Sequence, residues 1–277
     1  YNTTSGHGIS LFSCGNVSIT GNHIHDLKMQ TGVVGQVQAI LIKHKPYGVI
    51  SIRNNWIHYV YSGFMCNLEN SSIENNLMYN LQTYGIWGSE GMGGCSTQGF
   101  SNNTIRHNTI ISSSGPAIML DKPDDGCSNG GARSNIIKDN ILITKTSTTS
   151  GEKQPLSIWT YNNGVVGHST TLDYNLYYQP GTNRVSEYGT PYSYSSWKSR
   201  YSTDAHSLSA NPIFVNPSSP SAPKDFGLLS SSPGKGKASD QKDIGIIVSL
   251  VGTGDPSYQA DTTQPLSPTG LQINVVN

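Results

Sequence analysis

The chain has 277 residues, with 17 Lys and Arg against 17 Asp and Glu, so its formal net charge is +0. A surface with no basic excess argues against nucleic acid or a polyanionic membrane as a partner. Charged residues make up only 12%, and no run approaches the roughly 18 apolar residues of a membrane-spanning helix. We therefore expect no membrane span and a surface rich in hydroxyl and amide groups.

A short segment recurs along most of the chain. Each copy centres on an asparagine that follows an aliphatic residue by three positions and precedes another apolar residue by two. The anchors are Asn22, Asn55, Asn76, Asn108, Asn140 and Asn175, with gaps of 33, 21, 32, 32 and 35 residues. A repeat of about 20 to 50 residues indicates a solenoid, because one copy alone cannot bury its apolar side.

The copies are short β-branched runs broken by Gly, Asn and Ser, which predicts strands rather than helices. A second short run precedes each anchor, as in Ala39-Ile40-Leu41-Ile42. Alternation along these runs predicts an inward column formed by Ile9, Ile40, Phe64, Ile86 and Ile118. Three strands joined by a variable turn and a tight turn at the asparagine make one coil of a parallel β-helix, which rises by about 4.8 Å.

Asparagine tolerates left-handed backbone geometry and hydrogen-bonds to its own kind, so we expect the six anchors to form an internal ladder. The whole pattern resembles the right-handed parallel β-helix repeat proteins, a family dominated by secreted pectate and alginate lyases, polygalacturonases and related carbohydrate enzymes. The resemblance covers roughly residues 6 to 247. It implies an all-β, single-stranded, right-handed parallel β-helix of about six or more coils.

Three segments follow in chain order. Residues 1–181 hold the coils, and Tyr1 falls directly before a strand, so we expect a cap and further coils upstream. Residues 182–250 resemble the irregular C-terminal segment that closes many bacterial β-helix carbohydrate enzymes. Residues 251–277 resemble a linker toward a fibronectin type III module.

Two of the four cysteines occupy equivalent places in adjacent coils. Cys95 and Cys127 each precede their anchor by 13 residues. Neighbours one strand spacing apart lie within disulfide range, so we predict a Cys95–Cys127 disulfide and an extracellular or periplasmic location. Cys66, on an inward position, and Cys14, in a turn, are expected to remain thiols.

The resemblance also implies that a sugar chain lies along the outward face of the first strand. One outward column there contains Phe12, Lys43, Asn67, Ser89, Asp121 and Trp159, and the column two residues earlier contains Ser10, Leu41, Met65, Trp87, Met119 and Ser157. The turn beyond adds His44, Lys45, Glu69, Glu90, Asp124, Asp125 and Tyr161. Acids, bases and aromatic rings thus gather in the central coils, which favours an acidic polysaccharide, pectate-like or alginate-like, as the substrate.

Cleavage of a uronate by β-elimination needs a base near the C5 proton and a cation that neutralises the carboxylate. Lys43 or His44 is the candidate base, and the predicted catalytic set also includes Glu69, Glu90 and Asp121. Asn67, Trp87, Trp159 and Tyr161 are the candidate sugar-binding residues. Asp121, Asp124 and Asp125 offer oxygen ligands to a hard cation such as Ca²⁺.

Two alternatives stay open. In a glycoside hydrolase, carboxylates one coil apart would lie about 5 Å from each other and those two coils apart about 9 to 10 Å. Glu90 with Asp121 would then suit retention, and Glu69 with Asp121 inversion. Gly6-His7-Gly8 followed by Leu41-Ile42-Lys43 resembles a polygalacturonase pattern, with Leu41 where that family has arginine. In a non-catalytic solenoid used for adhesion or filament formation, the same groups are a solvated face.

Overall fold

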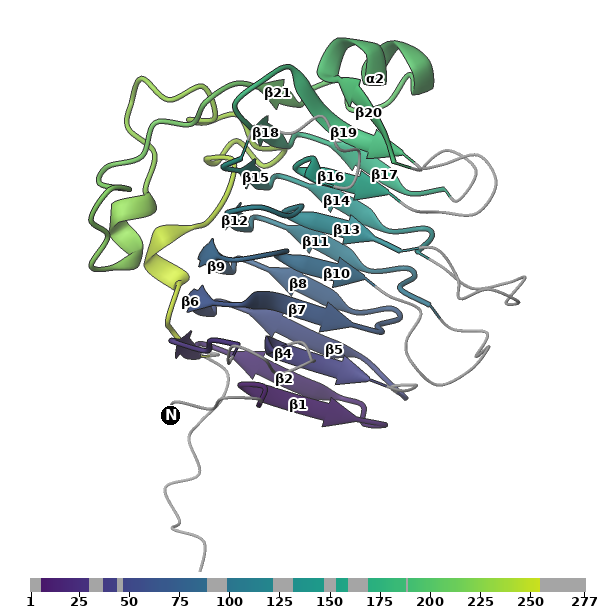
Figure 1. Ribbon diagram of the computed structural model, residues 1–277, viewed down its shortest axis with the longest axis vertical. Coiled ribbons are helices and arrows are strands. Elements are labelled where there is room, and N and C mark those ends of the chain that lie inside the picture. Colours follow the sequence, from purple (N-terminus) through teal and green to yellow (C-terminus); the bar gives the residue numbers. More distant parts are fainter. Residues whose placement is uncertain are drawn as a thin grey trace, which may run out of the picture.

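The computed structural model describes residues 6–29, 37–43, 47–88, 99–121, 132–146, 153–158, 169–187 and 189–254. Within these ranges the strands form three sheets, and each sheet takes roughly every third strand along the chain. The strands stack one above another from the purple N-terminal end to the green C-terminal end (Figure 1). This is the predicted parallel β-helix.

In each sheet the strands stack in chain order from the first strand upward. Sheet one contains β1 (Ile9–Phe12), β4 (Gln38–Lys43), β7 (Ser62–Cys66), β10 (Ile86–Gly88), β13 (Ile118–Leu120), β16 (Leu156–Ile158), β19 (Asn183–Glu187) and β20 (Thr190–Ser193). Sheet two contains β2 (Val17–Thr20), β5 (Ile50–Arg53), β8 (Ser72–Glu74), β11 (Thr104–Arg106), β14 (Ile136–Lys138) and β17 (Thr171–Asp173). Sheet three contains β3 (His23–His25), β6 (Trp56–Val60), β9 (Leu77–Leu81), β12 (Thr109–Ser112), β15 (Ile141–Thr144), β18 (Leu176–Tyr178) and β21 (Leu208–Ser209).

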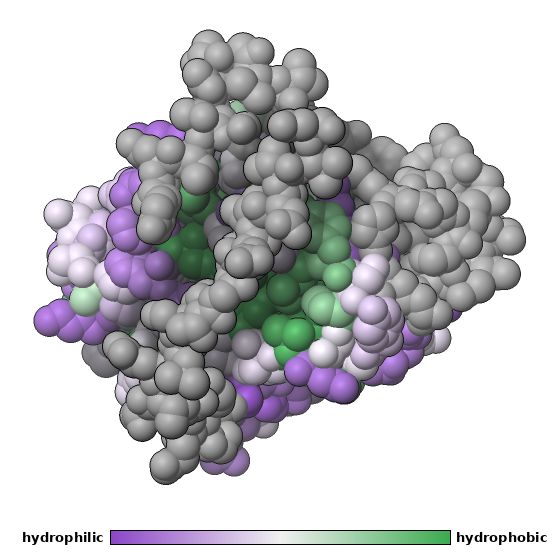
Figure 2. All heavy atoms as spheres, turned by 90° about the horizontal axis from the view of Figure 1, so that it is seen from below, coloured by the Kyte–Doolittle hydropathy of each residue, from purple (hydrophilic) through white to green (hydrophobic). Residues whose placement is uncertain are grey.

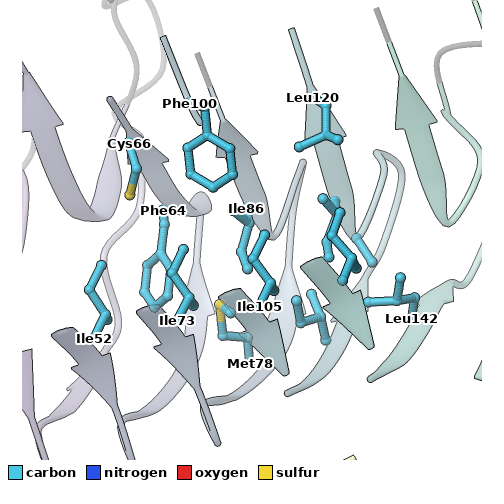
Figure 3. Packing of buried hydrophobic residues seen from close by; sticks show 14 of the residues in the cluster. Ile52, Phe64, Cys66, Ile73, Met78, Ile86, Phe100, Ile105, Leu120 and Leu142 are labelled. Atoms are coloured by element: carbon cyan, nitrogen blue, oxygen red, sulfur yellow. The ribbon is translucent and has the colours of Figure 1, made fainter. Parts of the chain in front are cut away.

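The core runs up the centre of the coil. In sheet one Ile40 pairs with Phe64, Phe64 with Ile86, and Ile86 with Ile118, and all four side chains are fully buried. The inward column predicted from alternation is therefore confirmed for these residues. Figure 3 shows further rows of the same kind, and from below hydrophobic residues fill the middle of the coil (Figure 2).

The asparagine ladder is also confirmed. Each anchor donates from Nδ2 to the Oδ1 of the next anchor up the stack, from Asn22 to Asn175, at 2.8 to 3.0 Å. The expectation of left-handed geometry at the anchors is wrong. Positive φ belongs instead to the preceding residue, for example 59° at Asn54 and 53° at His107. The residue before each anchor therefore adopts the left-handed conformation that the tight turn requires. The anchor side chain then points along the stack toward the next coil.

A second ladder lies in the turns between sheets one and two. Asn103 donates from Nδ2 to Asn135 Oδ1 at 3.1 Å, and its own Oδ1 accepts from the backbone N–H of Ser71 at 3.0 Å. Asn103 is 1% exposed and Asn135 is fully buried. These amides satisfy backbone groups that the turns would otherwise leave buried without partners.

The upper end of the solenoid is closed by the hairpin β19–β20 and by helix α2 (Tyr194–Tyr201). Ser193 caps the helix, and Trp197, fully buried, packs against the main core. Beside it, the buried carboxylate of Asp204 accepts hydrogen bonds from the hydroxyls of Tyr177 and Ser207. Burial raises the pKa of Asp204 to about 6.

The chain then returns toward the lower end along the outer face of sheet three, drawn light green to yellow in Figure 1. This return segment, residues 210–254, contains the short helices η2 (Pro223–Phe226) and η3 (Val248–Leu250). Its apolar side chains form a second core with the outward residues of sheet three, as where Phe226 packs on Tyr79 at 4.4 Å between ring centroids. At the lower end Gly252 N–H donates to Asn54 O at 2.7 Å.

Both cysteines in the described ranges are free. Cys66 is fully buried in the core, where burial raises the pKa of its thiol, and Cys14 is half-buried. Cys95 and Cys127 lie outside the described residues, so their disulfide stays a prediction.

Candidate functional site

The predicted outward column stands at the carboxyl end of sheet one. Lys43 pairs with Phe12 below it, Asn67 N–H donates to Ile42 O at 3.0 Å, and Asp121 N–H donates to Gly88 O at 2.9 Å. In parallel strands these bonds place Lys43, Asn67 and Asp121 in one column. Lys43 and Asp121 are half-buried, whereas Asn67 is 3% exposed.

An aromatic group sits within this face. Trp87 pairs with Met65 below and Met119 above, and its indole N–H donates to Asp121 Oδ2 at 2.9 Å. Tyr84 meets the indole edge-on, with ring centroids 5.2 Å apart. The Trp87 ring is thus held at two points and remains half-buried, so part of it meets solvent.

The lower part of the same face is less open than its outward alternation suggests. Leu41 is 1% exposed and Met65 is 4% exposed, although both occupy outward positions. Ser157, higher in the column, is fully buried. Outward direction therefore does not equal access here. Ser10 and Phe12 on the lowest strand are exposed, and above them the partly accessible residues of the two columns are Lys43, Trp87, Met119 and Asp121.

Glu69 belongs to a neighbouring column in the turn after sheet one. It bridges to Ser101, and Ser101 bridges to Arg133, one coil higher each time. Ser101 Oγ donates to Glu69 Oε1 at 3.4 Å. Glu69 is half-buried and stands two residues beyond Asn67, in a coil two below that of Asp121.

Several predicted site residues lie outside the described residues and stay predictions: His44, Glu90, Asp124, Asp125, Trp159 and Tyr161. Within the described ranges, no three His, Cys, Asp or Glu side chains are placed to hold a metal ion. The Ca²⁺ site proposed at Asp121, Asp124 and Asp125 therefore depends on two residues that are not described.

His7 is electrostatically linked to Lys43. Burial, and then the positive charge of Lys43, lower the pKa of His7 below its usual value. Its Nδ1 accepts from Gln38 N–H at 3.2 Å, which puts the proton of the neutral ring on Nε2. A neutral His7 can thus donate a hydrogen bond from Nε2.

A group that sequence reasoning missed covers the lower outer face of sheet three. It consists of three histidines and three aromatic residues on adjacent strands: His23, His25, Trp56, His58, Tyr59 and Tyr79. His23 stacks on Trp56 with centroids 3.8 Å apart and planes at 1°. His23 Nε2 and His58 Nε2 are 2.7 Å apart, so one ring donates to the other.

The pKa values of two imidazoles in this group are lowered. Burial, followed by the charges of His23 and His25, lowers the pKa of His58 to about 4, and burial lowers the pKa of His23 as well. The signal was present in the repeat: His23 and Trp56 follow their anchors by one residue, and His25, His58 and Tyr79 by three. Those positions point outward from sheet three, on the side away from the asparagine ladder.

A cleft of about 450 Å³ lies between the turns after sheet two and the return segment. Most of its titratable groups are paired with each other. Arg106 binds Glu74 at 3.2 Å, Lys242 binds Asp240 at 3.1 Å, and His107 Nε2 also reaches that aspartate at 3.2 Å. This pairing makes the cleft a structural junction between the coils and the return segment.

Stacked parallel sheets, a continuous apolar centre and internal asparagine ladders define a solenoid of the parallel β-helix class. The sequence matches the family described as "Right handed beta helix region" over residues 6–177, more than half of the chain, and the protein belongs to this family. The match also gives the hand of the coil.

Among solved structures, the chain is similar to a PL6 family polysaccharide lyase from Pseudopedobacter saltans, with 12% sequence identity and a TM-score of 0.30. The likeness covers 62% of this chain and 43% of the lyase, so the chain spans less than half of that protein. No curated protein matches it in sequence. None of the helices in the described ranges has the length and apolar character needed to span a bilayer.

Proposed function

We propose that the protein is a secreted carbohydrate-active enzyme that cleaves an acidic polysaccharide, pectate-like or alginate-like, by β-elimination. The substrate would lie along the outer side of sheet one, across the coils from Lys43 to Asp121. The observation that supports this most is the half-buried Trp87, held by Asp121 and Tyr84 in the column beside the Lys43 side chain.

The Trp87 ring suits a sugar because it is amphipathic and fixed. A pyranose ring presents C–H groups on one face, and an immobilised indole binds that face with little loss of side-chain entropy. The hydrogen bond to Asp121 removes the freedom that an exposed tryptophan would otherwise lose on binding. Lys43 lies three strands below Asp121 in sheet one, or roughly 14 Å at 4.8 Å per strand.

Elimination would proceed in two linked proton movements. Lys43 or His44 takes the proton from C5, the electrons form the C4–C5 double bond, and the C4–O4 bond breaks as O4 receives a proton from water or from the protonated base. A cation beside the uronate carboxylate lowers the energy of the carbanion-like transition state. His7, as a neutral donor at Nε2, is suited to hydrogen-bond an oxygen of the same sugar.

Calcium is proposed as a cation of this face, with Asp121, Asp124 and Asp125 as its ligands. Because Asp121 lies roughly 14 Å from Lys43 along the stack, this ion would bind the carboxylate of a uronate farther along the polymer and hold the chain in register for the base. Carboxylate oxygens are its preferred donors. One oxygen of the Asp121 carboxylate accepts from Trp87, which would fix the orientation of the group toward an ion.

A hydrolase on the same scaffold is the second candidate, and one observation favours it. Glu69 and Asp121 belong to coils two apart, a spacing of about 9 to 10 Å along the stack and close to the upper end of the range for an inverting pair, although Glu69 stands in the neighbouring column. In that case the products would carry new reducing ends and no double bond.

The test uses the whole chain with pectate, alginate and a glycosaminoglycan as substrates. Elimination is followed as new absorbance at the ultraviolet edge from unsaturated products. We expect Lys43→Ala to lower the rate by about 10² to 10⁴-fold, and chelation to reduce it. Lys224→Ala, an exposed lysine of the return segment, is the matched control and should leave the rate unchanged.

Three results would count against the proposal. Reducing ends that form without the absorbance would favour the hydrolase. Glycan binding or self-assembly with no cleavage would favour the non-catalytic solenoid. A lyase activity that Lys43→Ala leaves intact would move the reaction away from this face.

A further inference from the structure

Three histidines meet on the outer face of sheet three, on the two lowest strands. His23 and His25 lie two residues apart on β3 and so share one face. His58 on β6 pairs with His25 in register. Their ring centroids are 4.5, 5.0 and 5.3 Å apart, so each ring is close to both others.

We propose that His23, His25 and His58 bind one divalent transition-metal ion of the Zn²⁺ type. Imidazole nitrogens are good ligands for such ions, and three of them with an open fourth position are a common donor set. Two histidines in alternation on one strand and a third on the neighbouring strand present their rings to a single point above the sheet.

The ring spacing fits this assignment. Imidazole binds Zn²⁺ at about 2.0 to 2.1 Å, so three rings around a tetrahedral ion have centroids roughly 5 Å apart. His23 Nε2 and His58 Nε2 already face each other at 2.7 Å. An ion between them needs these nitrogens at roughly 3.3 Å, a small opening.

The rings must turn to complete the set, because no three donors in the described ranges surround one point as they stand. His23 and His25 are exposed, which leaves room for rotation about the side-chain bonds, and coordination of the ion has to outweigh the stacking of Trp56 on His23 and of Tyr79 on His58. The shared hydrogen between His23 and His58 would be replaced by the ion. Such a replacement keeps both nitrogens satisfied.

Neighbouring groups already orient the ligands. Asp26 Oδ2 lies 2.7 Å from His25 Nδ1, which fixes the proton on that nitrogen and leaves Nε2 free as a ligand. Trp56 stacks on His23, and Tyr79 stacks on His58 with centroids 4.9 Å apart. A carboxylate behind one histidine and aromatic rings beside the other two are the usual supports of a metal-binding imidazole.

The site is separate from the proposed glycan face and does not rest on it. It links the lowest two strands of sheet three, just beyond the part of the sheet that the return segment covers. A bound ion would tie these two coils together, because ligands from both must stay in place for it to bind.

The experiment titrates the whole chain, freed of metal by chelation, with ZnCl₂ in a calorimeter. We expect one ion per chain with a micromolar or tighter Kd, a higher melting temperature, and a visible absorption band when Co²⁺ replaces Zn²⁺. His23→Ala and His58→Phe should each weaken binding by at least tenfold. The phenylalanine preserves the stack on Tyr79, so lost binding cannot be ascribed to lost packing.

His206→Ala is the matched control. His206 is an exposed histidine that binds Asp173 at 2.8 Å and stacks on Tyr174, so it resembles His25 without the other two imidazoles. Its replacement should not alter Kd. Failure of the intact protein to bind Zn²⁺, or unchanged affinity in His23→Ala and His58→Phe, would overturn the proposal.

Discussion

The asparagine ladder gives the sharpest prediction about stability, through Asn108→Ala. Asn108 is fully buried, donates from Nδ2 to Ile73 O at 2.9 Å and to Asn140 Oδ1 at 3.0 Å, and accepts from Asn76 N–H at 2.9 Å. Alanine removes all of these side-chain bonds.

The magnitude follows from the groups that lose their partners. Two losses dominate: the buried N–H of Asn76 loses its acceptor, and Ile73 O loses the hydrogen bond from the Asn108 side chain. Each unsatisfied buried group costs about 1–3 kcal/mol. With the small cavity, we expect the free energy of unfolding to fall by about 3–5 kcal/mol. For a chain of this size that corresponds to a drop of roughly 10 °C in Tm.

Thermal and urea unfolding, followed by circular dichroism, would measure the loss. Asn211→Ala is the matched control, because Asn211 is exposed and lies outside the ladder. It should change the free energy of unfolding by less than about 0.5 kcal/mol. If Asn108→Ala loses no more than the control, the ladder does not hold the coils together.

Three further changes test other parts of the structure. Because the pKa of Asp204 is about 6 in the folded chain and 3.8 for an ordinary aspartate, the folded chain keeps a proton between these pH values that the unfolded chain releases. Its contribution to the free energy of unfolding should therefore decrease by about 2–3 kcal/mol as pH rises from 4 to 6, and Asp204→Asn should flatten this dependence in urea titrations at each pH. Gly85→Ala should cost about 2–3 kcal/mol in urea unfolding, since a Cβ would lie 2.2 Å from Ile110 Cγ2, whereas Gly254→Ala, with open space around it, should cost nothing measurable. Phe226→Ala should speed hydrogen exchange in residues 210–254 and leave the coils protected, because Phe226 anchors the return segment on sheet three; uniform exchange throughout would contradict this.

The fold could be predicted because every coil repeats the same frame. The fixed spacing of an aliphatic residue, an asparagine and another apolar residue predicted an interior ladder. The structure places all six anchors in that ladder. The ladder through Asn103 and Asn135 was not predicted, because the asparagine itself does not repeat: the equivalent place holds Ser71 one coil below and Thr170 one coil above. Local turn geometry was assigned one residue too late for a similar reason: the left-handed position accepts Asn, His, Asp or Tyr and leaves no residue signature.

The candidate site could be predicted only in part from the sequence. Alternation gave the outward column of Lys43, Asn67 and Asp121, since strand direction follows from period two. It could not show that Leu41 and Met65 are buried on that same face, because coverage depends on segments distant in the sequence. The Trp87 to Asp121 hydrogen bond joins neighbouring coils, so it depends on register that only the stacked structure supplies.

The histidine group was not predicted, because the candidate site residues came only from the outward face of the first strand of each coil and from the turn beyond it. His23, His25 and His58 occupy outward positions of sheet three. Whether such a position is covered depends on where the return segment packs on the sheet. Farther up, the same positions are apolar and covered, as at Ile111 and Ile143. At these outward positions the side chains change from apolar to imidazole where the return segment stops covering the sheet.

Mass spectrometry of the products from pectate and alginate tests the central claim most directly. Elimination predicts fragments with an unsaturated terminal sugar, each one water lighter than the corresponding hydrolysis product, formed by the wild type and not by Lys43→Ala. Fragments that are all saturated, or intact polymer after prolonged incubation with the wild type and Ca²⁺, would contradict the proposed lyase.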